Sequence, residues 1–576
     1  MSIKNADGRL RRDVALMYEA AAQIGVHLDV RQTAQDIVDV LVPALGDLAT
    51  VDLSEMVCRG EEPAWLLPSG APASAQRVAV AGDLPPGVVG LGGSLPVIPR
   101  IPQALAVQSG EIVRVDDPYE VLSAAMDPAR AALVGPADAR ISLTAPLYAR
   151  GLSLGAVTLW LVGPERTCDD SDVALIREIV SRGALAVDNA RRYAHEHGVA
   201  EALQRRLLPR SCTSTSAADT AAGYLPAETG AGVGGDWFDA IPLPSARIAF
   251  VVGDVVGRGL SATATMARLR TAVQTLADID LQPDELLTHI DDLVLRLAAE
   301  AESESEPPVG ATCVYAVYDP VAGHCRLASA GHPPPAVLRP GGVPRFVDVS
   351  PGPPLGVGGL PFEVAELQLD PGSVLAFYTD GLTDGDDHDP GAGMVRLAEA
   401  LKVADTPGRP LANMCGDILA ALKAKAGRDD TTLLLARTRT LNADDVRNWE
   451  FPAEPQAVGD ARSAVVGTMD QWGLYEMTFV TELVISELVT NAMRYAAGPI
   501  GVRLIRDDVL VCEVSDPSNT QPRLRRARYT DEGGRGLFLV AQMTDRWGCR
   551  YRRDGKTIWT EQAIRTCGGD AGVDGE

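Results

Sequence analysis

Short apolar runs in the middle of the chain end or begin at aspartate, and this pattern limits the fold more than any other sequence feature. The runs and their acids are Ile248–Val252 with Asp254, Val374–Tyr378 with Asp380, and Thr432–Ala436 with the pair Asp429-Asp430. A fourth acid, Asp236, follows two glycines. Runs of this length read as buried strands, so the pattern predicts a sheet domain with carboxylates at its strand ends.

Carboxylates gathered in this way suit a shared site for hard divalent cations, Mg²⁺ or Mn²⁺, which prefer oxygen ligands. Without cations, clustered carboxylates repel one another or take up protons. Gly253 and Gly381 stand beside two of the acids and are expected to let the backbone approach the ions closely. Each Asp-Gly pair taken alone is only a turn signal.

Length and composition predict several globular domains. The chain has 576 residues, of which 46% are hydrophobic and 22% charged, and a net charge of 52 − 77 = −25. This charge disfavours nucleic acid and anionic membranes as partners. Nine cysteines without a Cys-x-x-Cys pair, no apolar leader and no spanning apolar stretch predict a soluble cytoplasmic protein with reduced thiols.

Residues 10–168 are expected to form an α+β sensor module. Helical periodicity runs from about 10 to 45, an irregular stretch rich in Pro and Gly spans 61–102, and a hairpin is predicted at Ile141–Leu161. The hairpin segment Ala145-Pro-Leu-Tyr-Ala-Arg-Gly151 with Gly155-Ala-Val-Thr-Leu-Trp160 resembles GAF sensor domains, which implies an unknown small-molecule ligand.

Residues 169–210 are predicted to be a helical linker, with one long helix from Asp169 to about Leu208 that Pro209 ends. Its apolar stripe is equally compatible with packing inside the first domain and with a dimerising helix that passes a signal onward. A homodimer therefore stays an open alternative.

The acidic motifs of residues 221–439 together resemble the PPM metal-dependent serine/threonine phosphatases, closest to the SpoIIE/RsbU branch. The resemblance implies an α/β/β/α sandwich with two or more Mn²⁺ or Mg²⁺ ions at one edge. The residues it implies as metal ligands are Asp236, Asp254, the carbonyl of Val255, Asp380, Asp384 and Asp429, with Asp254 and Asp380 essential for catalysis. The resemblance gives His332 no catalytic role, and it is expected to be structural.

A second set of candidate functional residues lies in residues 448–565. A helix is predicted there over Thr478–Tyr495. Glu487 and Asn491 are four residues apart and share a helix face. Gly534 and Gly536 open a later helix, where backbone N–H groups can face phosphates.

With Asp516 and Lys556-Thr557, these residues resemble the GHKL (Bergerat) ATPase fold, an α/β sandwich, and specifically the anti-sigma-factor serine kinases. The resemblance implies ATP with Mg²⁺: Asn491 as Mg²⁺ ligand, Glu487 as base and Asp516 as adenine contact. Gly534 and Gly536 would line the lid, and Thr557 belongs to the same implied nucleotide site.

The usual Asp-x-Gly-x-Gly box reads Asp516-Pro-Ser-Asn519 here and lacks both glycines. Basic residues Arg523–Arg528 fall in the implied lid, either as a solvated loop or as a phosphate or partner contact. The resemblances together imply a phosphatase and kinase acting on a STAS-type anti-anti-sigma phosphoprotein, with a sigma factor as a further partner. The alternative is a carboxyl-terminal domain that only sequesters a sigma factor or STAS protein.

Overall fold

The computed structural model describes residues 2–63, 74–96, 98–163, 166–207, 209, 212–226, 234–300, 309–384, 389–406, 408–423, 429–496, 498–520, 536–552 and 555–564. The chain divides into two compact units, Met1–Ala202 and Leu203–Glu576, which are taken separately below. None of the described helices has the length and apolar content needed to cross a bilayer.

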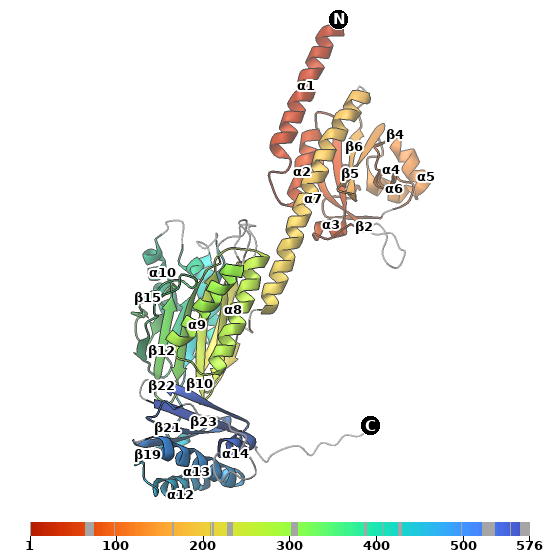
Figure 1. The fold of residues 1–576 in the computed structure, drawn as a ribbon. Helices are drawn as coiled ribbons and strands as arrows, with labels where there is room; N and C mark the ends of the chain where they lie inside the picture. The colour runs from red at the N-terminus through yellow and green to blue at the C-terminus, as the bar shows by residue number, and fades with distance from the viewer. Residues whose placement is uncertain are drawn as a thin grey trace, which may run out of the picture. The chain divides into compact units, whose positions relative to one another are not determined.

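The first unit is a six-stranded antiparallel sheet in the order β3-β2-β1-β6-β5-β4 (Figure 1). The strands are β1 (Leu48–Ser54), β2 (Ser74–Gly82), β3 (Ser94–Pro96), β4 (Val113–Asp116), β5 (Ile141–Ala149) and β6 (Leu152–Leu161). Its helices are α1 (Ser2–Gln23), α2 (Val30–Leu41), α3 (Glu55–Cys58), α4 (Pro102–Ser109), α5 (Pro118–Ala125), α6 (Pro128–Val134) and α7 (Asp170–Leu207).

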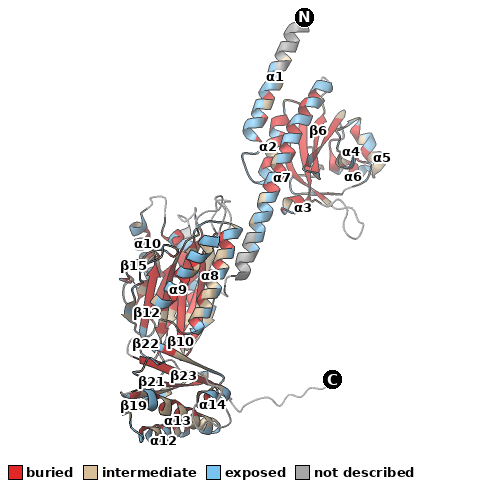
Figure 2. Cartoon of the chain, viewed as in Figure 1, coloured by how far each residue is buried: buried red, intermediate tan, exposed pale blue. Residues whose placement is uncertain are grey.

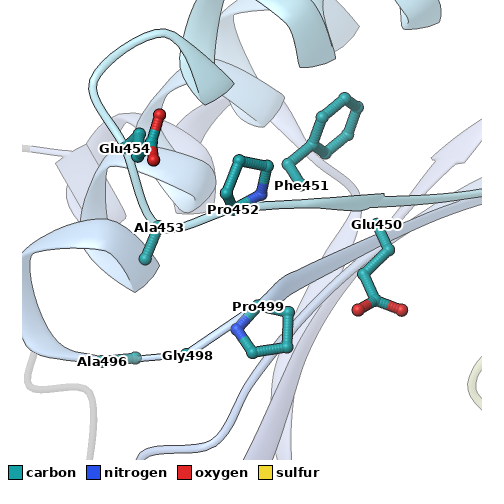
Figure 3. Close-up of a pocket in the computed structure, with 8 residues that line it drawn as sticks. All are labelled: Glu450, Phe451, Pro452, Ala453, Glu454, Ala496, Gly498 and Pro499. Atoms are coloured by element: carbon teal, nitrogen blue, oxygen red, sulfur yellow. The ribbon is translucent and has the colours of Figure 1, made fainter.

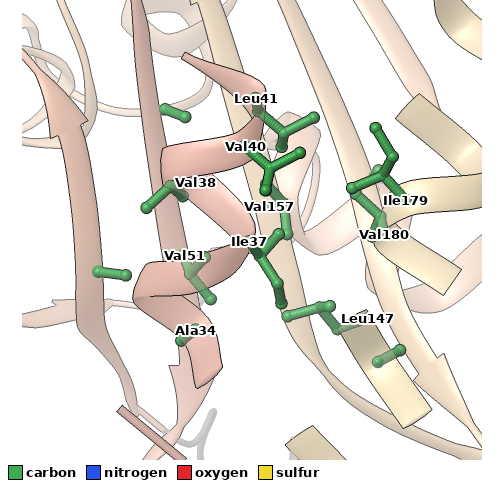
Figure 4. Packing of buried hydrophobic residues seen from close by; sticks show 14 of the residues in the cluster. Ala34, Ile37, Val38, Val40, Leu41, Val51, Leu147, Val157, Ile179 and Val180 are labelled. Atoms are coloured by element: carbon green, nitrogen blue, oxygen red, sulfur yellow. The ribbon is translucent and has the colours of Figure 1, made fainter. Parts of the chain in front are cut away.

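Two apolar clusters hold helices against the sheet. Ile37 of α2 and Ile179 of α7 pack with Val51 and Val157 of the sheet, as Figure 4 shows. A second cluster joins α4, α5 and α6 to Trp160. The expected α+β architecture is therefore present.

The sequence predictions for this unit hold in part. The Ile141–Leu161 hairpin is confirmed, and Arg150 and Gly151 take the positive φ angles (48° and 85°) that a tight two-residue turn requires. The long helix is confirmed as α7. The prediction of an irregular 61–102 stretch was wrong, because β2 and β3 lie in it; the surrounding prolines and glycines hid a strand that pairs with β1 along its whole length.

The second unit begins with a central domain of two stacked sheets. One has the order β15-β12-β11-β10-β9 with β16 on β12, and the other β14-β13-β17-β18-β8-β7. Its strands are β7 (Cys212–Ser214), β8 (Ala218–Leu225), β9 (Trp237–Leu243), β10 (Arg247–Val255), β11 (Ala311–Asp319), β12 (His324–Ala330), β13 (Ala336–Leu338), β14 (Arg345–Phe346), β15 (Pro351–Gly352), β16 (Ala365–Gln368), β17 (Val374–Tyr378) and β18 (Thr431–Thr438).

Four helices cover the outer faces of these sheets. They are α8 (Leu260–Asp278), α9 (Pro283–Glu300), α10 (Pro390–Ala404) and α11 (Leu411–Lys423), with the 3₁₀ turn η1 (Asp380–Leu382) after β17. The rings of Phe250 and Phe377 meet between the sheets with centroids 5.6 Å apart. Helices α8 and α9 pack on the first sheet, and α10 and α11 on the second. Figure 2 shows the buried strands beneath half-exposed helices, which is the expected α/β/β/α sandwich.

The carboxyl-terminal domain has one antiparallel sheet in the order β19-β20-β21-β23-β22, with helices on one face. Its elements are η2 (Ala443–Asp445), β19 (Val446–Phe451), α12 (Ala457–Trp472), η3 (Tyr475–Met477), α13 (Thr478–Tyr495), β20 (Ile500–Arg506), β21 (Val509–Asp516), α14 (Gly536–Met543), β22 (Arg546–Arg552) and β23 (Gly555–Ala563).

Candidate metal centre and nucleotide site

The two sheets of the central domain bring the predicted acids to the same ends of neighbouring strands. In the first sheet Trp237, the first residue of β9, pairs with Gly253 of β10, so Asp236 just before β9 lies next to Asp254 at the end of β10. In the second sheet Asp380 lies two residues after the end of β17, and Asp429-Asp430 precede the antiparallel β18. The sequence predicted that these acids share a site at strand ends, and the strand register brings them together there.

The charges of these acids act on one another. Burial, then the Asp254 and Asp430 carboxylates, raises the pKa of Asp236 well above its ordinary value. Burial, followed by Asp380 and Asp429, raises the pKa of Asp254 to about 7. Burial and the charges of Asp384 and Asp429 raise the pKa of Asp380 as well. The predicted ligands therefore form one electrostatic group.

Thr379 fixes the inner edge of this group. Its hydroxyl donates to Oδ2 of Asp236 at 2.7 Å and accepts the backbone N–H of Thr432 at 2.9 Å. A single buried hydroxyl thus ties the two sheets together at the carboxylates. Sequence reasoning missed Thr379, whose partners are distant in the chain.

The Asp429-Asp430 pair divides its roles in a way the sequence did not indicate. Asp430 is buried (3% exposed) and accepts hydrogen bonds from the backbone N–H of Gly234, at 2.7 Å, and from the Tyr224 hydroxyl. The Asp429 side chain is 53% exposed and pairs with Arg258 at 3.2 Å. Because β18 is buried on both faces, no alternation in the sequence could have marked Asp430 as the inner residue.

Gly253 and Gly381 allow neighbouring segments of the chain to pack closely. A Cβ on Gly381 would strike the carbonyl of Asp430, and one on Gly253 would lie 2.6 Å from the Trp237 ring. Both glycines thus have a packing role, and the close approach of their backbone to the ions stays a prediction. Gly235 is equally constrained, since a Cβ there would collide with Val255, whose N–H donates to the Gly235 carbonyl at 3.3 Å.

The oxygen donors of these acids suit a hard cation, although they are not already arranged around one metal position. Among the described residues, no three His, Cys, Asp or Glu side chains lie close enough together to hold a metal ion as they stand. The acids nevertheless offer only oxygen donors, and their mutual repulsion is what a divalent cation would relieve. Asp384 is exposed beside η1, and its charge is one of the causes that raise the pKa of Asp380.

His332 has the surroundings of a structural residue. It is 2% exposed, its Nε2 lies 3.1 Å from the carbonyl of Tyr378, and its Nδ1 lies 2.8 Å from the Thr312 hydroxyl. Burial lowers its pKa to about 3, so the ring is neutral at physiological pH. With Nε2 donating and Nδ1 accepting, both nitrogens are satisfied, and neither faces a reacting group.

In the carboxyl-terminal domain, three predicted residues meet at one point. Glu487 and Asn491 lie on α13, and Gly536 opens α14 against them: a Cβ on Gly536 would collide with the Glu487 carboxylate and lie 3.6 Å from Nδ2 of Asn491. The helix spacing had predicted the shared face, and the missing Cβ explains the glycine. Gly534 and Arg523–Arg528 lie outside the described residues.

Asp516 is engaged by its own chain. Strand β21 pairs with β23 so that Asp516 faces Lys556, whose Nζ lies 3.0 Å from Oδ1 of Asp516 and 3.2 Å from the carbonyl of Ser518. Oδ1 of Asp516 also accepts the N–H of Ser518 at 2.8 Å. Thr557, the next residue of β23, is 2% exposed.

A hollow of about 660 Å³ lies at the edge of the same sheet, as Figure 3 shows. Its walls are Glu450, Phe451, Pro452, Ala453, Glu454, Ala496, Gly498 and Pro499. Two carboxylates on the lining repel phosphate groups, so we assign no nucleotide to it.

Comparison with known families decides the identity of the central fold. The family model described as Stage II sporulation protein E (SpoIIE) matches residues 244–439, and the model of the histidine kinase-like ATPase domain matches residues 451–561. Residues 244–439 therefore belong to a SpoIIE-type PPM phosphatase domain, and residues 451–561 to a histidine kinase-like ATPase domain. The match begins just after Asp236 and includes the other four predicted acids.

Several known proteins are similar to parts of this phosphatase. Protein IcfG of Synechocystis sp. is 27% identical over 205 residues, which is 32% of this chain and 31% of IcfG. The chain thus matches about a third of that relative's length. The crystal structure of the RsbU and RsbW domains of Rv1364c from Mycobacterium tuberculosis is 26% identical and covers 62% of this chain and 95% of the other, with a TM-score of 0.36.

A structure of RsbX in complex with magnesium is 17% identical and covers 39% of this chain and 98% of the other, with a TM-score of 0.31. The phosphatase domain (central domain) and the ATPase domain (carboxyl-terminal domain) carry these names below. The sequence did not indicate Thr379 or the buried role of Asp430, whereas Glu487, Asn491 and Gly536 meet as predicted.

Proposed function

We propose that this phosphatase removes phosphate from serine or threonine of a STAS-type anti-anti-sigma protein. The observation that carries the proposal is the convergence of Asp236, Asp254 and Asp380 with the Asp429-Asp430 pair at adjoining strand ends. A group of repelling carboxylates inside a PPM fold is best explained by divalent cations.

Asp254, Asp380 and Asp429 would hold two or more Mn²⁺ or Mg²⁺ ions, with the Val255 carbonyl, Asp236 and Asp384 completing their shells. When bound, such ions supply Lewis acidity and a water that is nucleophilic at neutral pH. The protein's own contribution is orientation. Thr379 holds the Asp236 carboxylate by a 2.7 Å hydrogen bond.

The ATPase domain is proposed to bind ATP–Mg²⁺ and to phosphorylate the same partner, with Asn491 as Mg²⁺ ligand and Glu487 as base. Gly536 and Gly534 would line the phosphate side, and Asp516 and Thr557 the adenine side. Contact between the Gly536 backbone and Glu487 supports this arrangement.

A non-catalytic role for that domain has its own supporting observation. Lys556 neutralises Asp516 inside the sheet, at the position that resemblance gives to the adenine contact. A domain whose aspartate is engaged in this way could instead sequester a STAS protein or a sigma factor. The two roles differ in whether ATP is consumed.

Residues 10–168 are proposed to be a GAF sensor for a small molecule, and α7 to carry its state onward. Deleting residues 1–165 should then change the phosphatase rate or the Mn²⁺ requirement. Identical behaviour of the truncated and full chains under every condition would reduce α7 to a tether.

One experiment separates these roles. The full chain is incubated with STAS candidates in phosphorylated and unphosphorylated form, with Mn²⁺ alone or with ATP–Mg²⁺, and phosphate is followed on the partner. Loss of phosphate with Mn²⁺ supports the phosphatase. Gain with ATP–Mg²⁺ supports the kinase, and tight partner binding without gain supports sequestration.

A further inference from the structure

Polar and charged side chains are buried together where the phosphatase and ATPase domains meet within the second unit. Ser245, Arg247 and Asp280 come from the phosphatase domain, and Glu513 and Arg550 from the ATPase domain. Each is less than one-tenth exposed. Buried charges are costly unless they are paired and hydrogen-bonded, so this interface cluster requires an explanation.

The pairing crosses the domain boundary. Arg550 Nε lies 2.6 Å from Oδ2 of Asp280, and the same carboxylate receives Arg247 Nη2 at 2.7 and 2.6 Å. One aspartate is thus shared by arginines from two domains. Two buried arginines and two buried carboxylates leave the interface cluster neutral.

A second bridge runs beside the first. The Ser245 hydroxyl donates to Oε1 of Glu513 at 2.6 Å, and the Ser245 N–H donates to Oε1 of Glu561 at 3.1 Å. Arg550 also lies 3.4 Å from Oε1 of Glu513. Burial opposes ionisation of Glu513, but Arg550, Arg503 and the Ser245 hydroxyl outweigh it and lower its pKa to about 2.

The backbone of the phosphatase domain is strained at these contacts. Ser245, Ala246 and Asp280 have φ angles of 66°, 59° and 63°, in the left-handed region that residues other than glycine rarely occupy. They are three of the six such non-glycine residues in the described parts of the chain. Strain of this kind persists where the surroundings enforce it, and here the ATPase domain supplies contacts to two of the three.

The strained turns lie on elements that lead to the carboxylates. Ser245 and Ala246 form the turn of the β9–β10 hairpin, whose other end carries Asp236 and Asp254. Arg247 and Asp254 are seven residues apart on β10, a rigid span of about 23 Å. Asp280 follows α8, which begins two residues after Arg258, the partner of Asp429.

We propose that the interface cluster is a coupling site, through which the docked ATPase domain sets the cation affinity of the phosphatase carboxylates. The ATPase sheet holds the hairpin turn and Asp280, and β10 and α8 transmit their positions to Asp254 and Asp429. Release of the ATPase domain relaxes the left-handed turns and displaces the ligands. The proposal rests on the proposed metal site and adds its regulation.

Calorimetric titration of the full chain with Mn²⁺ alone tests this coupling without relying on catalysis. Arg550→Gln and Asp280→Asn each remove one cross-domain ion pair, and Asn tolerates the left-handed φ of position 280. We expect each to weaken Mn²⁺ binding roughly three- to tenfold, in the range of energetic coupling between distant sites. The double variant should be little weaker than either single one, because both break the same contact.

Two further variants serve as a milder test and as a control. Ser245→Ala keeps every charge and should fold if the others do not, with a smaller loss of about twofold. Arg506→Gln is the matched control, because Arg506 pairs with Asp445 inside the ATPase domain and should leave Mn²⁺ affinity unchanged.

The outcomes separate the two claims. A wild type that binds no Mn²⁺ overturns the proposed function and the coupling with it. Equal Mn²⁺ affinity in the wild type and in all folded interface variants overturns the coupling alone. Equal losses in the Arg506→Gln control and the interface variants would also contradict it, because the effect would then be general destabilisation.

Discussion

The two predicted sites of the second unit treat buried aspartate in opposite ways. In the phosphatase domain, Asp236 and Asp254 are surrounded by other carboxylates, and their pKa values rise. In the ATPase domain, Asp516 is buried as Asp236 is, but it has Lys556 at 3.0 Å. The first site is incomplete without added positive charge, whereas the second carries its own.

This contrast separates what each site requires from outside. Repelling carboxylates store an unfavourable free energy that a divalent cation would relieve. A buried aspartate–lysine pair has no such requirement, and a ligand that used Asp516 would have to compete with Lys556. Metal dependence is therefore expected to be absolute in the phosphatase domain, and nucleotide binding in the ATPase domain weaker.

The largest expected effect comes from neutralising one carboxylate of the first site. Asp254→Asn should lower the rate of phosphoprotein hydrolysis about a thousandfold or more, because a charged ligand becomes a weaker neutral one. Phosphate release at saturating Mn²⁺ measures it. Asp370→Asn, at an acid with 63% of its side chain exposed, is the control and should keep the wild-type rate.

Removing the positive charge of Lys556 should leave Asp516 as a buried carboxylate without a partner. Lys556→Met leaves the Asp516 carboxylate buried without its partner and should cost about 3–4 kcal/mol in the free energy of unfolding. Urea unfolding of the full chain measures this, with exposed Lys402→Met as control. A loss below about 1 kcal/mol would show that the pair contributes little.

Acid should act on the interface cluster through Glu513, whose pKa is lowered to about 2 by Arg550, Arg503 and Ser245 against the effect of burial. A depressed carboxylate pKa stabilises the fold above the unfolded value near 4.5 and loses that contribution as pH falls toward 2. Between about pH 6 and pH 3, the wild type should lose about 2 kcal/mol more than Glu513→Gln. Parallel pH profiles of unfolding would refute the role assigned to this carboxylate.

The smallest expected effect concerns the nucleotide. Asn491→Ala should weaken Mg²⁺-dependent ATP binding about tenfold, since its amide oxygen is the proposed ligand, whereas Glu487→Ala should spare binding and slow transfer. Calorimetry on the full chain, with and without Mg²⁺, separates the two. Equal affinity in the wild type and Asn491→Ala would favour the sequestering alternative.

The sequence predicted what local pattern controls. Apolar runs beside Asp254 and Asp380 predicted strand-end carboxylates, and the four-residue spacing predicted that Glu487 and Asn491 share a face. The sequence could not predict side-chain partners that depend on strand register or on the stacking of the two sheets. Examples are Lys556 opposite Asp516, Thr379 beneath Asp236, and the choice of Asp430 as the buried member of its pair.

The interface cluster was the least predictable feature. Arg550 lies 270 residues from Asp280, and nothing local distinguishes either residue from a surface charge. Strand β2 was hidden for a different reason, because its composition merges with that of the prolines and glycines around it. Long-range contacts, rather than local propensity, decide the interface cluster.

The central claim is that the strand-end acids of the phosphatase domain act through bound cations. Phosphate release from a phosphoserine protein by the full chain, measured with added Mn²⁺ and then with excess chelator, tests it most directly. The account predicts release that chelator abolishes, that Mn²⁺ restores and that Asp254→Asn lacks at every Mn²⁺ concentration. Release that continues at the same rate in chelator, or in Asp254→Asn, would contradict it.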